Sequence, residues 1–221
     1  MAPDTRLTGP DLWTTLWGRV ALQFGGNSWT WVLSRAGGLV AFALLSFSFG
    51  VGLLARTGWA RRRGWTGWMV VAHQWSALLV LAFAWLHAGV LLKDRFVPFR
   101  IDQILLPGRA PYAPFWVALG SAGIWVLAYV LLTFQLRRRL GERFWKSVHA
   151  FNPLLFVALL THGLVLGPDT HAFLGVGIYA ASLSWVLFAL GVYGRERATY
   201  RAQRTAPAAS ERARRTDKMP A

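Results

Sequence analysis

Four histidines lie inside long apolar stretches and form two pairs, His73 with His87 and His149 with His162. An ionisable side chain at membrane depth is costly and usually serves a function. The members of the first pair are 14 residues apart and those of the second are 13 apart, about 21 Å and 19.5 Å along ideal helices. In two helices that run in the same direction, His73 therefore lies level with His149, and His87 lies level with His162. Two facing imidazoles at each of two depths are the ligands of two bis-histidine haems stacked through a bilayer.

Other uses of these histidines need residues that the chain does not supply. Zinc and copper sites gather three or four ligands at one depth, and a proton relay uses Asp or Glu. The predicted spans contain no acidic residue, and the chain contains no cysteine. The lack of cysteine excludes disulfides, thiolate metal sites, iron–sulfur clusters and covalently attached c-type haem. Haem b, held by two neutral imidazoles without a covalent link, uses the residues that are present.

Five mostly apolar stretches are each long enough to cross a hydrocarbon core of about 30 Å. They are residues 36–55, 65–92, 114–136, 145–166 and 172–193. The 221-residue chain is 55% hydrophobic and 15% charged, whereas soluble proteins are about 25% charged. These features exclude a soluble fold and predict an all-α, polytopic transmembrane helix bundle of five spans.

The 13-residue spacing of His149 and His162 does not by itself place both rings on one helix face. At 100° per residue, 14 steps return to within about 40° of the starting direction, whereas 13 steps end about 140° away. Pro153 follows His149 by four residues and removes the amide that would bond the His149 carbonyl, which allows a kink between the two ligands. With that kink we expect two haems, and without it we expect one.

Basic residues predict the orientation of the bundle. Seventeen of the 24 Lys and Arg residues fall in the loops and the tail on one side, and seven fall on the other side. By the positive-inside rule, the C-terminus is cytoplasmic and the N-terminus is outside, in a multi-pass protein of the cell membrane. The net charge of +15 therefore orients the bundle and does not indicate nucleic-acid binding.

The segments around the spans carry further predictions. Residues 1–28 have apolar residues at helical spacing, so they form an amphipathic helix that lies on the membrane surface or covers one end of the bundle. The long outer loop, residues 93–113, is expected to cover the outer haem. Residues 195–221 are basic and lack apolar periodicity, which predicts a disordered cytoplasmic tail that is too short for a flavin or nicotinamide domain. Arg35, at the outer end of the first span, either pairs with a propionate of the outer haem or anchors the helix at the interface.

The histidine pairs and several local motifs resemble the ferric reductase-like transmembrane domain family. The motifs are Ser34-Arg35-Ala36-Gly37-Gly38-Leu39-Val40-Ala41, the Arg137-Arg138-Arg139-Leu140-Gly141 turn with Trp145 and His149, and His162-Gly163. The resemblance covers residues 30–194 and is to short bacterial members without a fused flavin domain. It implies that all four histidines are haem ligands and that electrons pass from the cytoplasmic haem to the outer one. FAD and NAD(P)H would then act only through a partner protein.

We therefore expect an oxidoreductase component that moves electrons across the membrane from a cytoplasmic flavoprotein or a quinol to an acceptor at the outer face. A second hypothesis is a quinol-linked haem subunit that supplies a separate periplasmic oxidoreductase. A third is a haem-free membrane scaffold in which the histidines form interhelical hydrogen bonds. Direct contact between the His73 and His149 rings would favour the scaffold, and a gap wide enough for porphyrin would exclude it.

Overall fold

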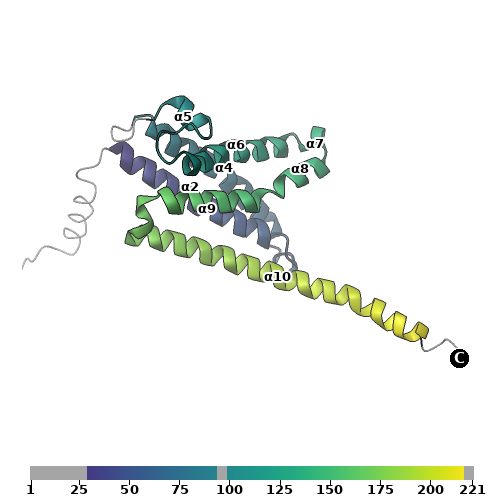
Figure 1. The fold of residues 1–221 in the computed structure, drawn as a ribbon. Coiled ribbons are helices and arrows are strands. Elements are labelled where there is room, and N and C mark those ends of the chain that lie inside the picture. The colour runs from purple at the N-terminus through teal and green to yellow at the C-terminus, as the bar shows by residue number, and fades with distance from the viewer. Residues whose placement is uncertain (1–28, 94–98, 217–221) are drawn as a thin grey trace, which may run out of the picture.

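The computed structural model describes residues 29–93 and 99–216, so the predicted amphipathic segment, residues 1–28, lies outside the described residues. The described residues form helices joined by short turns, and no strand occurs among them (Figure 1). In chain order the helices are α2 (Trp29–Leu54), α3 (Gly58–Arg62), α4 (Thr66–Leu91), α5 (Ile101–Leu105), α6 (Pro114–Gln135), α7 (Arg137–Leu140), α8 (Glu142–His149), α9 (Asn152–Leu166), the 3₁₀-helix η1 (Pro168–His171) and α10 (Phe173–Thr216). The all-α prediction is confirmed.

Five helical segments are long and apolar enough to cross a membrane. They are Trp29–Leu54, Thr66–Leu91, Pro114–Gln135, Glu142–Leu166 and Phe173–Arg204. All five predicted spans are found, although the first helix begins at Trp29 and not at residue 36. Thr30 and Ser34 are buried in this additional part, so packing against neighbouring helices extends the span beyond its most apolar stretch.

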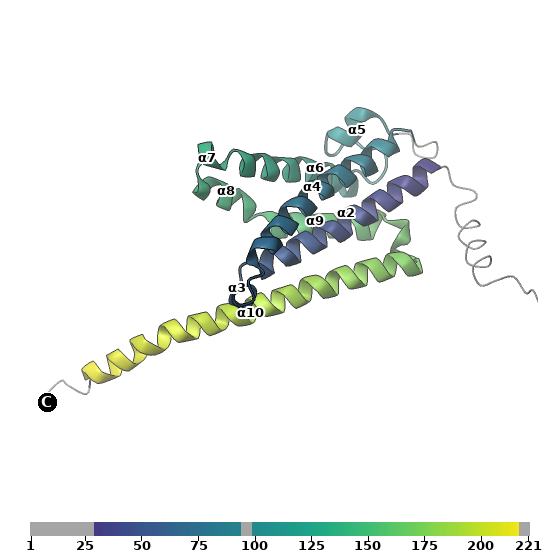
Figure 2. The same cartoon turned by 180° about the vertical axis from the view of Figure 1, so that it is seen from behind.

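Helix α2 lies between α4 and α10 and packs along both (Figures 1 and 2). Its contact with α4 is antiparallel, because Ser34 meets His87 near one end and Ser48 meets His73 near the other. Helix α6 packs along α9. Apolar clusters fill the spaces between these helices and hold them in one register.

The fourth span is interrupted between its two histidines. Helix α8 ends at His149 and α9 begins at Asn152, with a turn at Ala150 and Phe151 between them. Pro153 lies in the first turn of α9, where its missing N–H needs no helical partner. The interruption that Pro153 allows is therefore present, and the two ends of the span are free to direct their histidines independently.

Helix α10 continues far beyond the other helices, so the prediction of a disordered tail is wrong for residues 195–216 (Figures 1 and 2). A helix already nucleated in the span is extended at little further cost, and the Ala, Arg and Glu of this segment have high helix propensity. Glu196 also fixes the helix to the turn after α2. Its carboxylate accepts hydrogen bonds from the Gly58 N–H at 2.6 Å and from Arg62 at 2.9 Å.

Candidate functional site

The four histidines meet in two facing pairs, as their spacing predicts. The centre of the His73 ring lies 5.9 Å from that of His149, and the two ring planes are 88° apart. The ring centres of His87 and His162 are 6.4 Å apart, with their planes at 86°. We call these pairs the His73 level and the His87 level. Helix α4 supplies one ring at each level, and α8 and α9 supply the opposite rings.

The separation of the rings fits two imidazoles bound to one metal ion. Two metal–nitrogen bonds of about 2 Å, with about 1.1 Å more from each nitrogen to its ring centre, place the centres about 6.2 Å apart. Edge-to-face aromatic pairs have centres about 4.5–7 Å apart, so the distances also suit direct packing of the rings. Among the described residues, no group of three or more His, Cys, Asp or Glu is placed to hold a metal ion.

Hydrogen bonds determine which nitrogen of each ring is available as a ligand. In three rings Nδ1 lies against a backbone carbonyl oxygen: Ser34 for His87 (2.7 Å), Ser48 for His73 (2.9 Å) and Trp116 for His162 (2.8 Å). A carbonyl oxygen can only accept, so in the neutral ring Nδ1 carries the proton and Nε2 keeps its lone pair. A neutral imidazole oriented in this way is ready to bind a metal through Nε2.

The fourth ring, His149, has a side-chain partner in place of a carbonyl. The amide nitrogen of Asn152 lies 3.0 Å from Nδ1 of His149, while the buried amide oxygen of Asn152 has no hydrogen-bond partner. A 180° rotation of the amide exchanges these two atoms, so that the oxygen accepts the Nδ1 proton. In this orientation all four rings donate from Nδ1 and present Nε2.

Helix α2 repeats one arrangement at both levels. Ser34 and Ser48 are 14 residues apart, and their hydroxyl oxygens lie 3.1 Å and 3.0 Å from Nδ1 of His87 and His73. Each hydroxyl also donates to the backbone carbonyl of the same histidine, at 3.2 Å in both cases. Sequence reasoning missed these serines, although their spacing equals that of the two histidines on α4 and could have identified them.

Three glycines leave room for the rings. A Cβ on Gly38 or Gly52 of α2 would lie 3.1 Å or 3.0 Å from Nδ1 of the nearest histidine. A Cβ on Gly120 of α6 would lie 2.6 Å from Cε1 of His162, which is closer than real Cβ atoms approach. A side chain at Gly120 would displace the His162 ring, and at Gly38 and Gly52 the histidine ring would have to give by a few tenths of an ångström.

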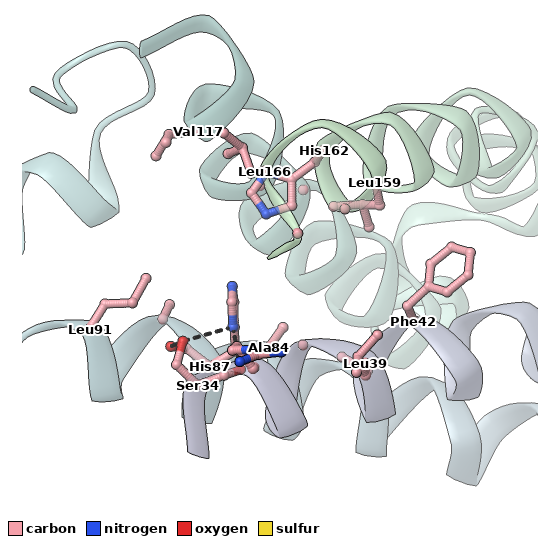
Figure 3. A pocket seen from close by; sticks show the side chains of 18 of the residues that line it. Ser34, Leu39, Phe42, Ala84, His87, Leu91, Val117, Leu159, His162 and Leu166 are labelled. Atoms are coloured by element: carbon pink, nitrogen blue, oxygen red, sulfur yellow. Dashed lines mark hydrogen bonds between the residues drawn. The ribbon is translucent and has the colours of Figure 1, made fainter. Parts of the chain in front are cut away.

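A cavity of about 500 Å³ lies at the His87 level (Figure 3). The rings of His87 and His162 point toward one another across it, and Leu39, Phe42 and Leu159 lie along its side (Figure 3). Cofactor sites have volumes of about 300–1,000 Å³ and mostly apolar walls with a few polar groups. The loop predicted to cover this level contributes to the lining through Phe99, Ile104 and Tyr112.

Arg35 lines the same cavity, and its guanidinium is paired with Asp169 of η1. Nε of Arg35 donates to Oδ2 of Asp169 at 2.7 Å, and Nη2 donates to Oδ1 of the same carboxylate. The Trp31 ring centre lies 4.0 Å from the guanidinium carbon. The ion pair is mostly buried, with 15% of the Arg35 side chain and 13% of the Asp169 side chain exposed. Sequence reasoning missed Asp169, because no spacing rule links the first span to the loop after the fourth.

The fold and the site define a helical protein with five membrane-length segments and two levels of paired histidines. Comparisons of the chain with protein families, with curated proteins and with solved structures find no match. A functional assignment therefore depends on the chemistry of the site.

Proposed function

We propose that the protein binds one haem b at each level and transfers electrons across the membrane. The observation that carries this proposal is the separation of the facing ring centres, 5.9 Å at one level and 6.4 Å at the other. The expected separation for two imidazoles on one metal is about 6.2 Å. The Nδ1 hydrogen bonds support the same proposal, because they leave Nε2 of His73, His87 and His162 as the free ligand atom, and that of His149 as well once the Asn152 amide is rotated.

Haem held by the paired histidines would supply one-electron redox chemistry. The chain has the task of holding and orienting the cofactor. The carbonyls of Ser34, Ser48 and Trp116 fix the tautomer and the direction of three rings. Arg35 uses Nε and Nη2 for Asp169, so Nη1 is the group it offers to a propionate at the His87 level.

The charge distribution supports an orientation of the two levels in the membrane. The His73 level lies toward the end of the bundle that carries Arg61, Arg62 and Arg63, which we place in the cytoplasm. The electron donor at that side is a flavoprotein or a quinol, with any FAD or NAD(P)H held by the partner. The acceptor meets the His87 level at the outer face. This is the function of a ferric reductase-like electron-transfer subunit.

Haem content and absorption test the proposal directly. We expect the purified protein to contain about two haems per chain and to show the absorption of reduced b-type haem after dithionite. His73→Ala and His162→Ala should each remove about one haem, because each deletes one of the two histidines that would hold it. His171→Ala is the matched control, since His171 is exposed in η1 and faces neither pair.

The opposite result would favour the haem-free scaffold. In that case the purified protein contains no haem, and the histidine variants lower thermal stability without any spectroscopic change. Such an outcome would assign the ring pairs to edge-to-face packing, which their distances also suit.

A further inference from the structure

An open cleft of about 730 Å³ lies where α3 and the turn before it meet α10 (Figure 2). Its two walls are joined by the Glu196 carboxylate, which accepts hydrogen bonds from the Gly58 N–H at 2.6 Å and from Arg62 at 2.9 Å. The cleft is strongly basic, because arginines from both walls line it. They are Arg56, Arg61, Arg62, Arg195 and Arg197.

Tyr193 of α10 brings arginines of the two walls to one place. The guanidinium carbon of Arg56, in the turn after α2, lies 6.0 Å from the centre of the Tyr193 ring. Nη1 of Arg197 donates a hydrogen bond of 3.4 Å to the hydroxyl of the same tyrosine. Glu196 and its partner Arg62 are close by, since Glu196 follows Tyr193 by three residues, less than one helical turn.

The positive charge of the cleft exceeds the negative charge that the described residues place there. Glu196 is already shared between Arg62 and the Gly58 N–H. Within the described ranges, no carboxylate lies at ion-pair distance from Arg56 or Arg197. Like charges this close repel one another, and a bound anion offsets the repulsion. The planar fork of a guanidinium group matches two oxygens of a phosphate, so phosphate is the anion that we expect.

The depth of the cleft indicates a phosphate of the membrane itself. Arg56 comes two residues after the end of α2, and Tyr193 is the last residue of the apolar stretch predicted for the fifth span. The lining residues of α10 continue from Tyr193 to Gln203, about 15 Å further along the helix. The headgroup layer begins where the hydrocarbon ends and is about 5–8 Å thick on each side. The inner part of the cleft therefore lies at the depth of phospholipid phosphates.

We propose that this cleft binds the headgroup of an anionic phospholipid, with Arg56 and Arg197 on its phosphate. The inference goes beyond the proposed electron transfer and does not depend on haem. Basic pockets between transmembrane helices on the cytoplasmic side are suited to anionic headgroups. A lipid held there joins α10 to the turn after α2, a connection that Glu196 already makes within the chain.

Native mass spectrometry of the full-length protein in detergent tests the proposal, with phosphatidylglycerol as the anionic probe and phosphatidylcholine as the neutral one. We expect one phosphatidylglycerol to bind more tightly than phosphatidylcholine does. The double variant Arg56→Gln with Arg197→Gln should weaken this binding about thirtyfold, because each basic residue near an anionic lipid contributes about fivefold.

Arg138→Gln with Arg139→Gln is the matched control. It removes the same charge from two exposed residues that lie outside the cleft, on the same predicted side of the membrane. This variant should bind phosphatidylglycerol as the wild type does.

Three results would overturn the inference. Equal binding of the two lipids by the wild type would mean that the cleft does not select an anion. Equal losses in the two double variants would assign the binding to general charge attraction and not to the cleft. Displacement of phosphatidylglycerol by inorganic phosphate at the same concentration would assign the cleft to a soluble phosphate. None of these measurements involves haem, so each failure would leave the proposed electron transfer unaffected.

Discussion

Replacing Gly120 by alanine adds one methyl group where α6 touches the His162 ring. The new Cβ would lie 2.6 Å from Cε1 and 2.9 Å from both ring nitrogens, whereas ordinary contact begins at 3.4 Å. The ring must therefore retreat by about 0.8 Å, the difference between 3.4 Å and 2.6 Å. The retreat displaces Nε2 and strains the 2.8 Å bond from Nδ1 to the Trp116 carbonyl. Functional groups need to be held within about 0.5 Å of their working geometry.

The expected effect on the fold is smaller than the effect on the site. Overpacking a core position costs about 1–3 kcal/mol, and alanine in place of glycine in a helix returns about 1 kcal/mol. The free energy of unfolding should therefore fall by about 0–2 kcal/mol. The haem content should fall from about two to about one per chain, because the His73 level is not touched by the substitution.

The assay is the pyridine haemochrome ratio of the purified protein, with circular dichroism to follow helix content. Gly177→Ala is the matched control: no atom lies within 4 Å of a Cβ at that position of α10, so the variant should keep both haems and gain some helix stability. A Gly120→Ala protein with two haems and a wild-type spectrum would refute the reasoning, because it would mean that the His162 ring need not occupy the position described.

Three further substitutions test other contacts of the site. Asp169→Asn should lower the free energy of unfolding by about 3 kcal/mol, because it leaves the buried charge of Arg35 without its partner. Thermal unfolding in detergent measures this change. A double variant that also replaces Arg35 by Met should recover part of the lost stability. Pro153→Ala should favour a continuous fourth helix and release about one haem, whereas an unchanged haem ratio would show that other contacts maintain the turn. Asn152→Asp should lower one midpoint potential in a redox titration, because a carboxylate that accepts the Nδ1 proton of His149 makes that ring a stronger donor to iron. A potential that rises or stays constant would contradict the contact between residue 152 and Nδ1 of His149.

The spans and the facing histidines could be predicted because both depend on distances along the chain. Apolar length locates a span, and the rise per residue locates a histidine within it. The Pro153 interruption could be anticipated for the same reason, since a proline removes one identified helical hydrogen bond. The depth of each histidine follows without knowledge of which helices touch, whereas the facing of the rings also requires the second and fourth spans to be neighbours.

The contacts that sequence reasoning missed all depend on the register between helices. The carbonyl of Trp116 reaches His162 from α6, and the carboxylate of Asp169 reaches Arg35 from η1. Residues in each pair are far apart in the sequence, and neither a carbonyl nor a single aspartate has a recognisable pattern. The helical tail was mispredicted for a different reason. Apolar periodicity indicates which helix face is buried, and the tail has no such face. Helix α10 extends into the tail because its residues have high helix propensity and because Glu196 accepts a hydrogen bond from Gly58.

The unequal histidine spacings explain why the two halves of the site are built differently. A residue 14 positions further along a straight helix points in almost the same direction, so the uninterrupted helix α4 presents both of its histidine rings to the bundle interior. The uninterrupted helix α2 contacts these rings through two serines that are also 14 residues apart. A residue 13 positions further along does not point in the same direction, so the opposing span is divided into α8 and α9, each of which carries one ring.

Because the fourth span is divided, its two histidine rings are held by different neighbours, and no single continuous helix hydrogen-bonds to both of them. His149 is held from within its own span by Asn152, and His162 is held from α6 by Trp116. Variants of α2 should therefore affect the two levels alike, whereas variants of α6 and of the α8–α9 turn should separate them.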